Sequence, residues 1–234
     1  MTLRLSARAR TDLALTLLAL AGLLAWDASG WDLTVMRQFG NDAGFAWRDT
    51  WWASRVLHDG GRWAAWALLL ALAWTAARAP RAAGPALVTG PTGAERWRWI
   101  AAMLVCVLAV PALKRYSITS CPWDLSEFGG VAAYVSHWDF SASDGGPGHC
   151  FPSGHAVAAF AFLGMHFMWR EHDPRRARAW LAAVGVAGLV FGGGQLLRGA
   201  HYPSHTLWSA WLCWTICAAA AHLPLARRWR AHPA

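Results

Sequence analysis

The chain has 234 residues, of which 56% are hydrophobic and only 15% are charged. So few charged side chains cannot cover the surface of a soluble protein of this size, and so high an apolar content excludes a disordered chain. The formal net charge is +8, but the basic residues lie between apolar runs rather than in one patch, which indicates a membrane protein and not nucleic-acid binding.

Six apolar stretches follow one another along the chain. Several are shorter than the roughly 20 residues that cross a bilayer core, so flanking residues are expected to complete them. The 18 tryptophans lie largely at the ends of these stretches, as the interfacial belts of membrane helices require. The pattern predicts an all-α, polytopic membrane protein with six transmembrane helices in a single domain over residues 1–234. The stretches are 13–26, 63–77, 99–113, 156–169, 179–197 and 203–225.

The first stretch also has a second interpretation. A basic start, a short apolar run and then residues 27–30, Asp-Ala-Ser-Gly, resemble a signal peptide, although the small-residue cleavage pattern is poor. The segment 27–62 that follows is rich in tryptophan and in charges of both signs. We expect amphipathic helices on the membrane surface there, with Asp27 and Asp32 shaping the entrance to a site.

The arginines set the predicted orientation of the helices. Of the 21 basic residues, 14 fall near the two ends of the chain or in the segments 78–98 and 170–178. Such segments face the cytoplasm according to the positive-inside rule. We therefore expect a multi-pass protein of a bacterial inner membrane, with both termini cytoplasmic and a periplasmic active site. The arginines of this set are Arg4, Arg8, Arg10, Arg78, Arg81, Arg96, Arg98, Arg170, Arg175, Arg176, Arg178, Arg227, Arg228 and Arg230.

Three segments with unusual polar residues share the predicted outer face: 113–124, 149–155 and 195–205. Lys114, the only lysine of the chain, Arg115 and Arg198 offer cationic donors for an anion with several oxygens. Ser153 before a predicted helix supplies a capping hydroxyl and backbone amides at the positive end of a helix dipole, which suit phosphate. His155 and His201 can move protons or attack phosphorus near neutral pH. The set predicts phosphoryl transfer through a histidine, with no metal and no cofactor.

These segments resemble the signature of the type 2 phosphatidic acid phosphatase family, whose members are six-span membrane enzymes. The family pattern is Lys, six residues, Arg-Pro; then Pro-Ser-Gly-His; then Ser-Arg, five residues, His, three residues, Asp. The chain has Lys114, six residues and Cys121-Pro122; then Pro152-Ser153-Gly154-His155; then Gly194-Gln195, five residues, His201, three residues and His205. The motifs span residues 114–205, inside a motif-bearing core of about 99–222.

The resemblance implies a role for each matching residue. It implies that Lys114 binds the phosphate oxygens and that Ser153 and the Gly154 amide complete the phosphate cradle. It also implies that His155 protonates the leaving alkoxide. His201 is implied to attack phosphorus and to form a phosphohistidine that water or another acceptor discharges, with positioning and electrostatics carrying most of the catalysis.

Three polar partners of the family pattern are missing from this chain. The departures are Cys121 and Gln195 where the family has Arg, and His205 where the family has the Asp that orients the nucleophilic histidine. Arg198 lies one helical turn from Gln195, so we expect its guanidinium on nearly the same face. Asp124 is expected to orient His201 or to neutralise Arg198.

Two cysteines in the predicted outer loops, Cys121 and Cys150, suggest a reason for one departure. An oxidising exterior favours a disulfide between them, which would join the first motif to the second. Closing a loop of about 30 residues stabilises a fold by roughly 3–4 kcal/mol in the entropic treatment. The bond would also hold Lys114 in place relative to His155.

The expected function is a metal-independent lipid phosphatase that hydrolyses a lipid phosphate or pyrophosphate at the periplasmic face. Family substrates include phosphatidic acid, phosphatidylglycerol phosphate, isoprenyl pyrophosphates and lipid A phosphates. One alternative is a phosphotransferase that passes the phosphoryl group to a lipid or sugar acceptor. The other is an inactive lipid phosphate-binding protein in which the departures reflect decay. The expected partners are the lipid substrate and the membrane, and no nucleic acid.

Overall fold

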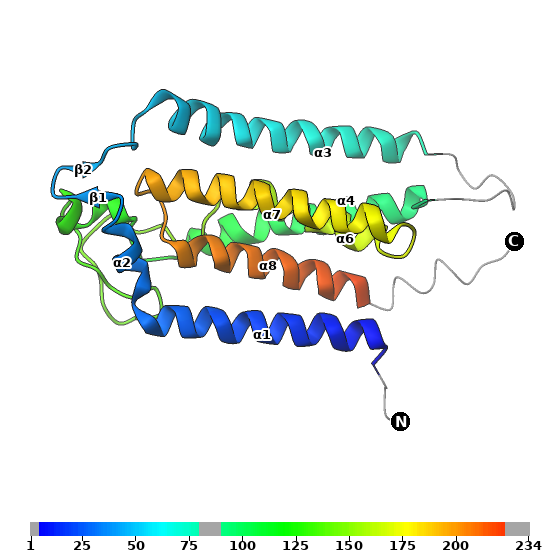
Figure 1. The fold of residues 1–234 in the computed structure, drawn as a ribbon, viewed down its shortest axis with the longest axis horizontal. Helices are drawn as coiled ribbons and strands as arrows, with labels where there is room; N and C mark the ends of the chain where they lie inside the picture. The colour runs from blue at the N-terminus through cyan, green and yellow to red at the C-terminus, as the bar shows by residue number, and fades with distance from the viewer. Residues whose placement is uncertain (1–4, 80–89, 223–234) are drawn as a thin grey trace, which may run out of the picture.

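The computed structural model describes residues 5–79 and 90–222 as an antiparallel bundle of helices (Figure 1). The loop end of the bundle carries a small hairpin and the long connection between α4 and α5. The terminal end carries the start of α1 and the last turn of α8. The elements are α1 Ala7–Ser29, α2 Trp31–Met36, β1 Gly40–Asn41, β2 Gly44–Phe45, η1 Trp52–Gly60, α3 Gly61–Ala77, α4 Gly93–Lys114, η2 Pro122–Asp124, η3 Ser126–Phe128, α5 Val157–Phe160, α6 Leu163–Trp169, α7 Pro174–Leu197 and α8 Pro203–His222.

All six predicted apolar stretches form helices where the structure describes them. The fourth stretch differs from the prediction because it is broken into α5 and α6. By length and composition, α1, α4 and α7 could each cross a membrane. Part of the sixth stretch lies outside the described residues, as do Arg4, Arg81, Arg227, Arg228 and Arg230 of the predicted inner segments.

Polar side chains mark where the helices begin. Ser6 caps α1 by accepting the Ala9 N–H at 3.2 Å. Thr92 forms a capping box with Glu95 at the start of α4, where each side chain satisfies the backbone N–H of the other residue. Asp173 caps α7 and is followed by Pro174, whose fixed φ suits the first helical position.

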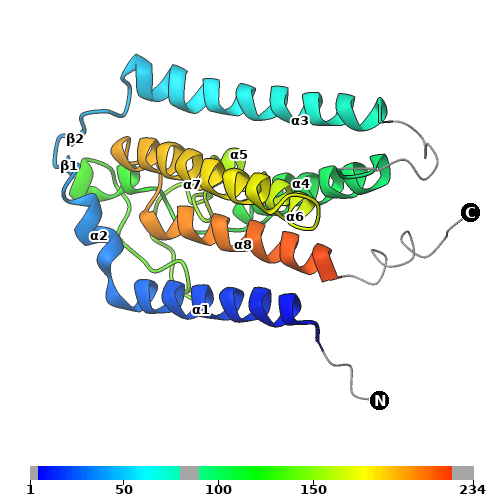
Figure 2. The same ribbon diagram turned by 45° about the vertical axis from the view of Figure 1, so that its right-hand side comes forward.

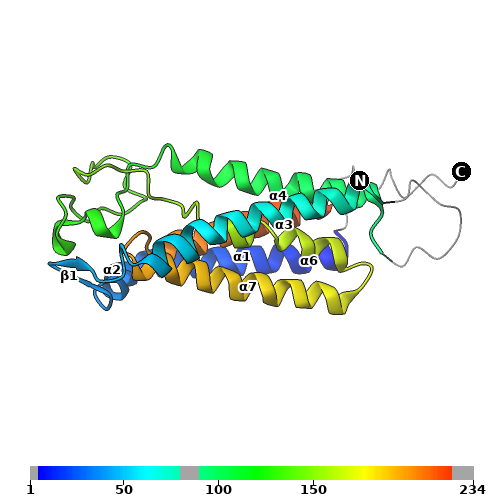
Figure 3. The ribbon, with the colours of Figure 1, turned by 90° about the horizontal axis from the view of Figure 1, so that it is seen from above.

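The helices are apolar both inside and outside the bundle. Cys106, Phe167 and Cys213 belong to a buried core that α3 to α8 share. Figures 2 and 3 show α1 and α3 flanking this core, with α1 packed on α8 and α3 packed on α4. Large apolar side chains on four helices nevertheless point outward, with exposures of 66–78%: Leu18, Leu70, Leu108 and Leu189. Helices that are apolar on all sides are typical of a bundle that meets lipid.

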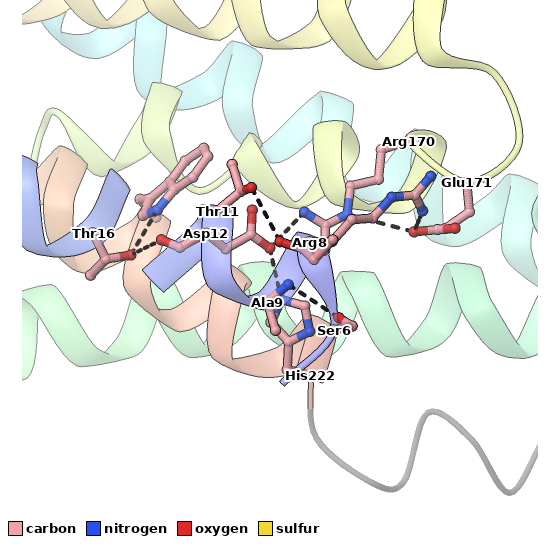
Figure 4. A network of polar contacts seen from close by, with 11 residues as sticks. Ser6, Arg8, Ala9, Thr11, Asp12, Thr16, Arg170, Glu171 and His222 are labelled. Atoms are coloured by element: carbon pink, nitrogen blue, oxygen red, sulfur yellow. Dashed lines mark hydrogen bonds and ion pairs between the residues drawn. The ribbon is translucent and has the colours of Figure 1, made fainter. Parts of the chain in front are cut away.

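One carboxylate ties three segments together at the terminal end (Figure 4). Asp12 of α1 is 6% exposed, and its Oδ2 lies 2.7 Å from Arg170 Nη1 and 2.7 Å from His222 Nε2. Arg170 directly follows α6, and His222 ends α8. A nearby ion pair at the surface, between Arg8 and Glu171, also joins α1 to the segment that follows α6.

A second apolar cluster holds the loop end together. Phe45 of the hairpin packs against Phe128 at 4.9 Å between ring centroids, and both contact a group that includes Tyr202. In the connection from α4 to α5, buried Asp144 accepts the Ser120 N–H at 2.6 Å and the Gly146 N–H at 2.9 Å. These contacts give the connection a defined path beside the start of α8.

Candidate active site

The three sequence motifs meet at the loop end of the bundle. Lys114 is the last residue of α4, the Pro152–His155 segment leads into α5, and His201 lies in the short link from α7 to α8. Backbone hydrogen bonds join the motifs directly. Trp123 N–H donates to Gly199 O at 2.9 Å, and Ser153 N–H donates to His205 O at 3.1 Å.

Lys114 and the second motif face each other. A Cβ built on Gly154 would lie 3.7 Å from Lys114 Cδ, so the lysine stem passes directly beside this turn. Ser153 is fully buried, and its Oγ accepts the Ala156 N–H at 3.3 Å, which leaves the hydroxyl hydrogen for a ligand. The helix expected directly after this motif begins only at Val157 and has four residues, so its dipole contributes less than predicted.

A turn at Gly199, directly after α7, places His201 in the interior of the protein. Gly199 N–H donates to Leu196 O at 2.9 Å and Ala200 N–H donates to Gln195 O at 2.8 Å, which is the Schellman pattern that ends a helix. Gly199 has φ +70°, and a Cβ there would clash with the ring of Phe45. Only glycine therefore fits this position.

The His201 imidazole is 4% exposed and has two close neighbours on Nδ1. Cys150 Sγ lies 3.5 Å from Nδ1, and His205 Nδ1 lies at the same distance of 3.5 Å. Burial, and then the charges of Lys114 and His205, lower the pKa of His201 well below its usual range. His201 is therefore a neutral imidazole at pH 7, the form in which a ring nitrogen has a lone pair for attack.

His155 lies against the π-helix η1. Its Nε2 is 3.3 Å from Leu57 O, and its ring stacks on His58 with centroids 4.5 Å apart. Because a carbonyl only accepts, the contact keeps a proton on Nε2 and leaves Nδ1 to gain or lose a proton. Burial, followed by the charge of His58, lowers the pKa of His155 to about 4.

The predicted disulfide between Cys121 and Cys150 is confirmed. The two sulfurs are bonded, and the Cα atoms lie 5.2 Å apart across a sequence separation of 29 residues. Cys150 is fully buried against His201, so the bond ties the loop after α4 to the immediate surroundings of the histidine.

Arg198 lies at the edge of the site rather than beside His201. Its Nε donates to Arg48 O at 2.9 Å, and its guanidinium is 5.8 Å from the ring centroid of Trp123. It lines a cavity of about 450 Å³ together with His58, the residue that stacks on His155. Asp49, Arg55 and Asp59 also line this cavity.

Asp124 caps a short helix, and Gln195, which stands where the family has Arg, is buried. Asp124 Oδ2 accepts the Cys121 N–H at 3.2 Å and so caps the short helix η2. Burial raises the pKa of Asp124, and the hydrogen bond from Cys121 opposes that change. Gln195 is 2% exposed, and its Nε2 has no hydrogen-bond partner among the described residues.

Two groups of side chains in the described segments have metal-ligand types within 4.8 Å of one another. The first comprises Cys121, Cys150 and His201, but its sulfurs form a disulfide and are not thiolates. The second comprises Asp27, Asp32 and His137. Its carboxylates already receive N–H and O–H donors, so these groups suit a hydrogen-bonded network better than a cation.

Sequence reasoning did not identify Leu57, His58 or His137 as site residues. Leu57 and His58 contact His155 from a segment about 100 residues earlier, and His137 lies 5.7 Å from His205 between ring centroids. The only signal was the density of tryptophan and charge in residues 27–62, which predicted an entrance and not a contact with a histidine.

Comparison with known proteins gives one result that bears on this geometry. A family model described as the PAP2 superfamily matches residues 95–229, more than half of the chain and all three motifs. No curated protein and no solved structure is significantly similar to the chain.

Proposed function

The chain belongs to the PAP2 superfamily, and on that premise we propose that it is a membrane-bound lipid phosphate phosphatase. Membership indicates phosphatase or phosphotransferase activity on phosphate esters. The proposal adds a lipid phosphate or pyrophosphate as substrate, a phosphohistidine intermediate, and chemistry without a metal or other cofactor.

One observation carries the proposal: cationic and proton-transferring groups converge without a counter-charge. Lys114 Cδ lies 3.7 Å from the position of a Cβ on Gly154, the residue before His155, and the charges of Lys114 and His155 both lower the pKa of His201. In the described part of the chain, none of the three forms an ion pair with a carboxylate. A bound phosphate dianion would supply the missing negative charge beside Lys114 and would favour the protonated form of His155, because an opposite charge favours the charged form of a cationic group. The site is therefore built for an anion.

The proposed reaction has two steps. His201 Nε2 forms a bond to phosphorus while the bond from phosphorus to the lipid oxygen breaks, and His155 gives its proton to that oxygen. Water then forms a new bond to phosphorus and loses a proton to His155, while the bond from nitrogen to phosphorus breaks. His155 needs a proton to begin, and the bound phosphate supplies the negative charge that raises its pKa from about 4.

The apolar outer faces of the helices support a lipid substrate. Leu18, Leu70, Leu108 and Leu189 point away from four different helices, so a lipid beside the bundle would remain in apolar surroundings. We place six spans in a bacterial inner membrane, with the terminal end cytoplasmic and the loop end periplasmic. The described arginines of the predicted inner segments, such as Arg96 and Arg170, lie at the terminal end, as this orientation requires.

A phosphotransferase is the second candidate because the cavity lined by His58, whose ring stacks on His155, offers room for an acceptor. Its volume of about 450 Å³ exceeds the space that one water molecule needs. Asp49, Asp59 and Arg198 on its wall could hydrogen-bond the hydroxyl groups of a sugar or polyol. An acceptor held there would compete with water for the phosphohistidine.

The test is phosphate release by detergent-purified protein against a panel of lipid phosphates and pyrophosphates, with EDTA present. We expect release from at least one lipid, and a fall of at least 10³-fold in His201→Ala and His155→Ala. His172→Ala at the terminal end is the matched control and should release phosphate at the wild-type rate. Loss of wild-type release upon EDTA addition would contradict a metal-independent reaction.

Two further measurements separate the remaining functions. Transfer of labelled phosphate to a sugar or lipid alcohol, with little free phosphate, would show a phosphotransferase. Lipid phosphate binding without release or transfer would show the inactive alternative. For binding, Lys114→Ala should weaken affinity, whereas Arg175→Ala is the control because Arg175 is exposed at the start of α7, at the opposite end of the bundle.

A further inference from the structure

The chain lacks the carboxylate that the family pattern places four residues after the nucleophilic histidine, and the structure offers another source of orientation. His201 must keep a proton on Nδ1 if Nε2 is to attack, so Nδ1–H needs an acceptor. Two neighbours could accept: His205 Nδ1 at 3.5 Å, and the backbone carbonyl of Cys150, which raises the pKa of His201 against the larger effect of burial. The disulfide sulfur of Cys150 is a weak acceptor.

His205 is the stronger candidate because its buried ring places an acceptor nitrogen within reach of His201 Nδ1. His205 is fully buried, so its ring is packed away from water, and its backbone carbonyl accepts the Ser153 N–H of the second motif. If its Nδ1 accepts from His201, neutral His205 must carry its own proton on Nε2. That atom is buried and has no hydrogen-bond partner in the described segments.

The ring of His137 packs against the ring of His205. The two rings are nearly perpendicular, at 82°, with centroids 5.7 Å apart, and His137 also stacks on Phe151 at 4.1 Å. His137 Nε2 is 3.4 Å from Asp27 Oδ2, which is an ion-pair separation without hydrogen-bond alignment. Both side chains are at most 7% exposed.

Asp27 is itself held rigidly. Its Oδ2 accepts the indole N–H of Trp138 at 2.8 Å and that of Trp208 at 2.9 Å. Three segments therefore meet at this carboxylate: α1, the connection from α4 to α5, and α8. Among residues 5–79 and 90–222, buried Asp27 Oδ1, His137 Nε2 and His205 Nε2 have no hydrogen-bond partner. Three such atoms on adjoining side chains require an explanation, because buried polar groups are rarely left unpaired.

We propose that His205 is the positioning residue that orients His201, and that His137 and Asp27 hold the His205 ring in place. In this arrangement a carboxylate of α1 helps to orient the nucleophile. Asp27 lies outside residues 95–229, the region that the family model matches. The inference rests on the proposed function, because it takes His201 as the nucleophile.

The first test reads the tautomer of His201 directly and needs no enzyme activity. Protein with ¹⁵N-labelled histidine is observed by NMR in detergent, with His201→Gln used to assign the signal. We expect the Nδ1–H tautomer to dominate in the wild type. It should lose population in His205→Leu and be restored in His205→Asn, whose side-chain oxygen also accepts. An unchanged tautomer in His205→Leu would assign the orientation to the Cys150 carbonyl and overturn the proposal.

The second test uses Asp27→Asn, which keeps an acceptor for both indoles and removes the charge. We expect kcat for phosphate release to fall 10- to 100-fold with KM within twofold, since positioning acts on the reacting geometry and not on lipid binding. Asp139→Asn is the control, because Asp139 is exposed in the connection from α4 to α5. Wild-type kcat in Asp27→Asn would remove Asp27 from the proposal. If the wild type releases no phosphate, the proposed function fails, while the tautomer measurement still decides the role of His205.

Discussion

His155 shows how the fold sets the charge of a single residue. Its folded-state pKa of about 4 lies below the usual 6.5, so the folded protein favours neutral His155. The resulting contribution to stability is complete above pH 6.5 and is lost as the pH falls toward 4. Stacked His58 is the second cause after burial, and it belongs to a segment that the sequence did not connect with catalysis.

His58→Asn should therefore change the pH profile of the proposed phosphatase. Removing the neighbouring charge raises the pKa of His155, by less than the gap between about 4 and 6.5 because burial remains the larger cause. The basic limb of kcat/KM against pH reports loss of the proton from the general acid, so it should move to higher pH. His172→Asn should leave the profile in place. A basic limb at the same pH in His58→Asn would show that the stacked ring does not influence His155.

At the scale of elements, α1 is held at both of its ends by carboxylates. Asp27 joins it to α8 and the outer connection, whereas Asp12 joins it to Arg170 and His222 at the terminal end (Figure 4). The side chains of Asp12 and Arg170 are only 8% and 14% exposed, so each needs the other's charge. The sequence predicted an apolar first span and did not predict this pairing.

Asp12→Asn should destabilise the bundle. The substitution leaves Arg170 with only the more distant carboxylate of Glu171, 4.0 Å from its Nε, and breaking a buried pair costs up to about 3–5 kcal/mol. The loss is measured as a lower midpoint of thermal unfolding in detergent. Arg8→Ala is the matched control, because the Arg8–Glu171 pair is exposed and such pairs contribute only about 0–1 kcal/mol. Equal midpoints for Asp12→Asn and wild type would show that water or detergent replaces the ion pair.

At the scale of the molecule, the two ends of the antiparallel bundle carry different sets of polar residues. Lys114, His155 and His201 lie at the loop end, whereas Asp12 and the described arginines of the predicted inner segments lie at the terminal end. This separation supports the proposed orientation, in which lipid phosphates reach the site from the periplasm.

Single cysteines test that orientation in intact cells. Ser143→Cys in the exposed outer connection should react with a membrane-impermeant maleimide, while Arg175→Cys at the start of α7 should react only after the membrane is opened. The native thiols of Cys106, Cys213 and Cys217 are buried, so wild-type protein provides the background. The reverse labelling pattern would place the site in the cytoplasm and contradict the proposed topology.

Much of the architecture could be predicted from the local sequence. The apolar stretches predicted where helices form, and the three motifs together predicted that Lys114, His155 and His201 lie at one end of the bundle. The outer positions of Cys121 and Cys150 predicted their disulfide, which the structure confirms. Composition and spacing suffice for such features because they depend on local hydrophobicity and on which helix ends share a face.

Other features depend on contacts between distant segments, and only the tertiary structure decided them. Leu57 reaches His155 across 98 residues, and Trp208 reaches Asp27 across 181. The break between α5 and α6 also has no marker in the hydrophobic pattern. Local hydrophobicity determined that this chain would form helices, and the spacing of its motif residues indicated the PAP2 superfamily, which the family model shows. Which side chains surround His155 and His201 was decided by packing, because burial and neighbouring charge exist only once the helices are assembled.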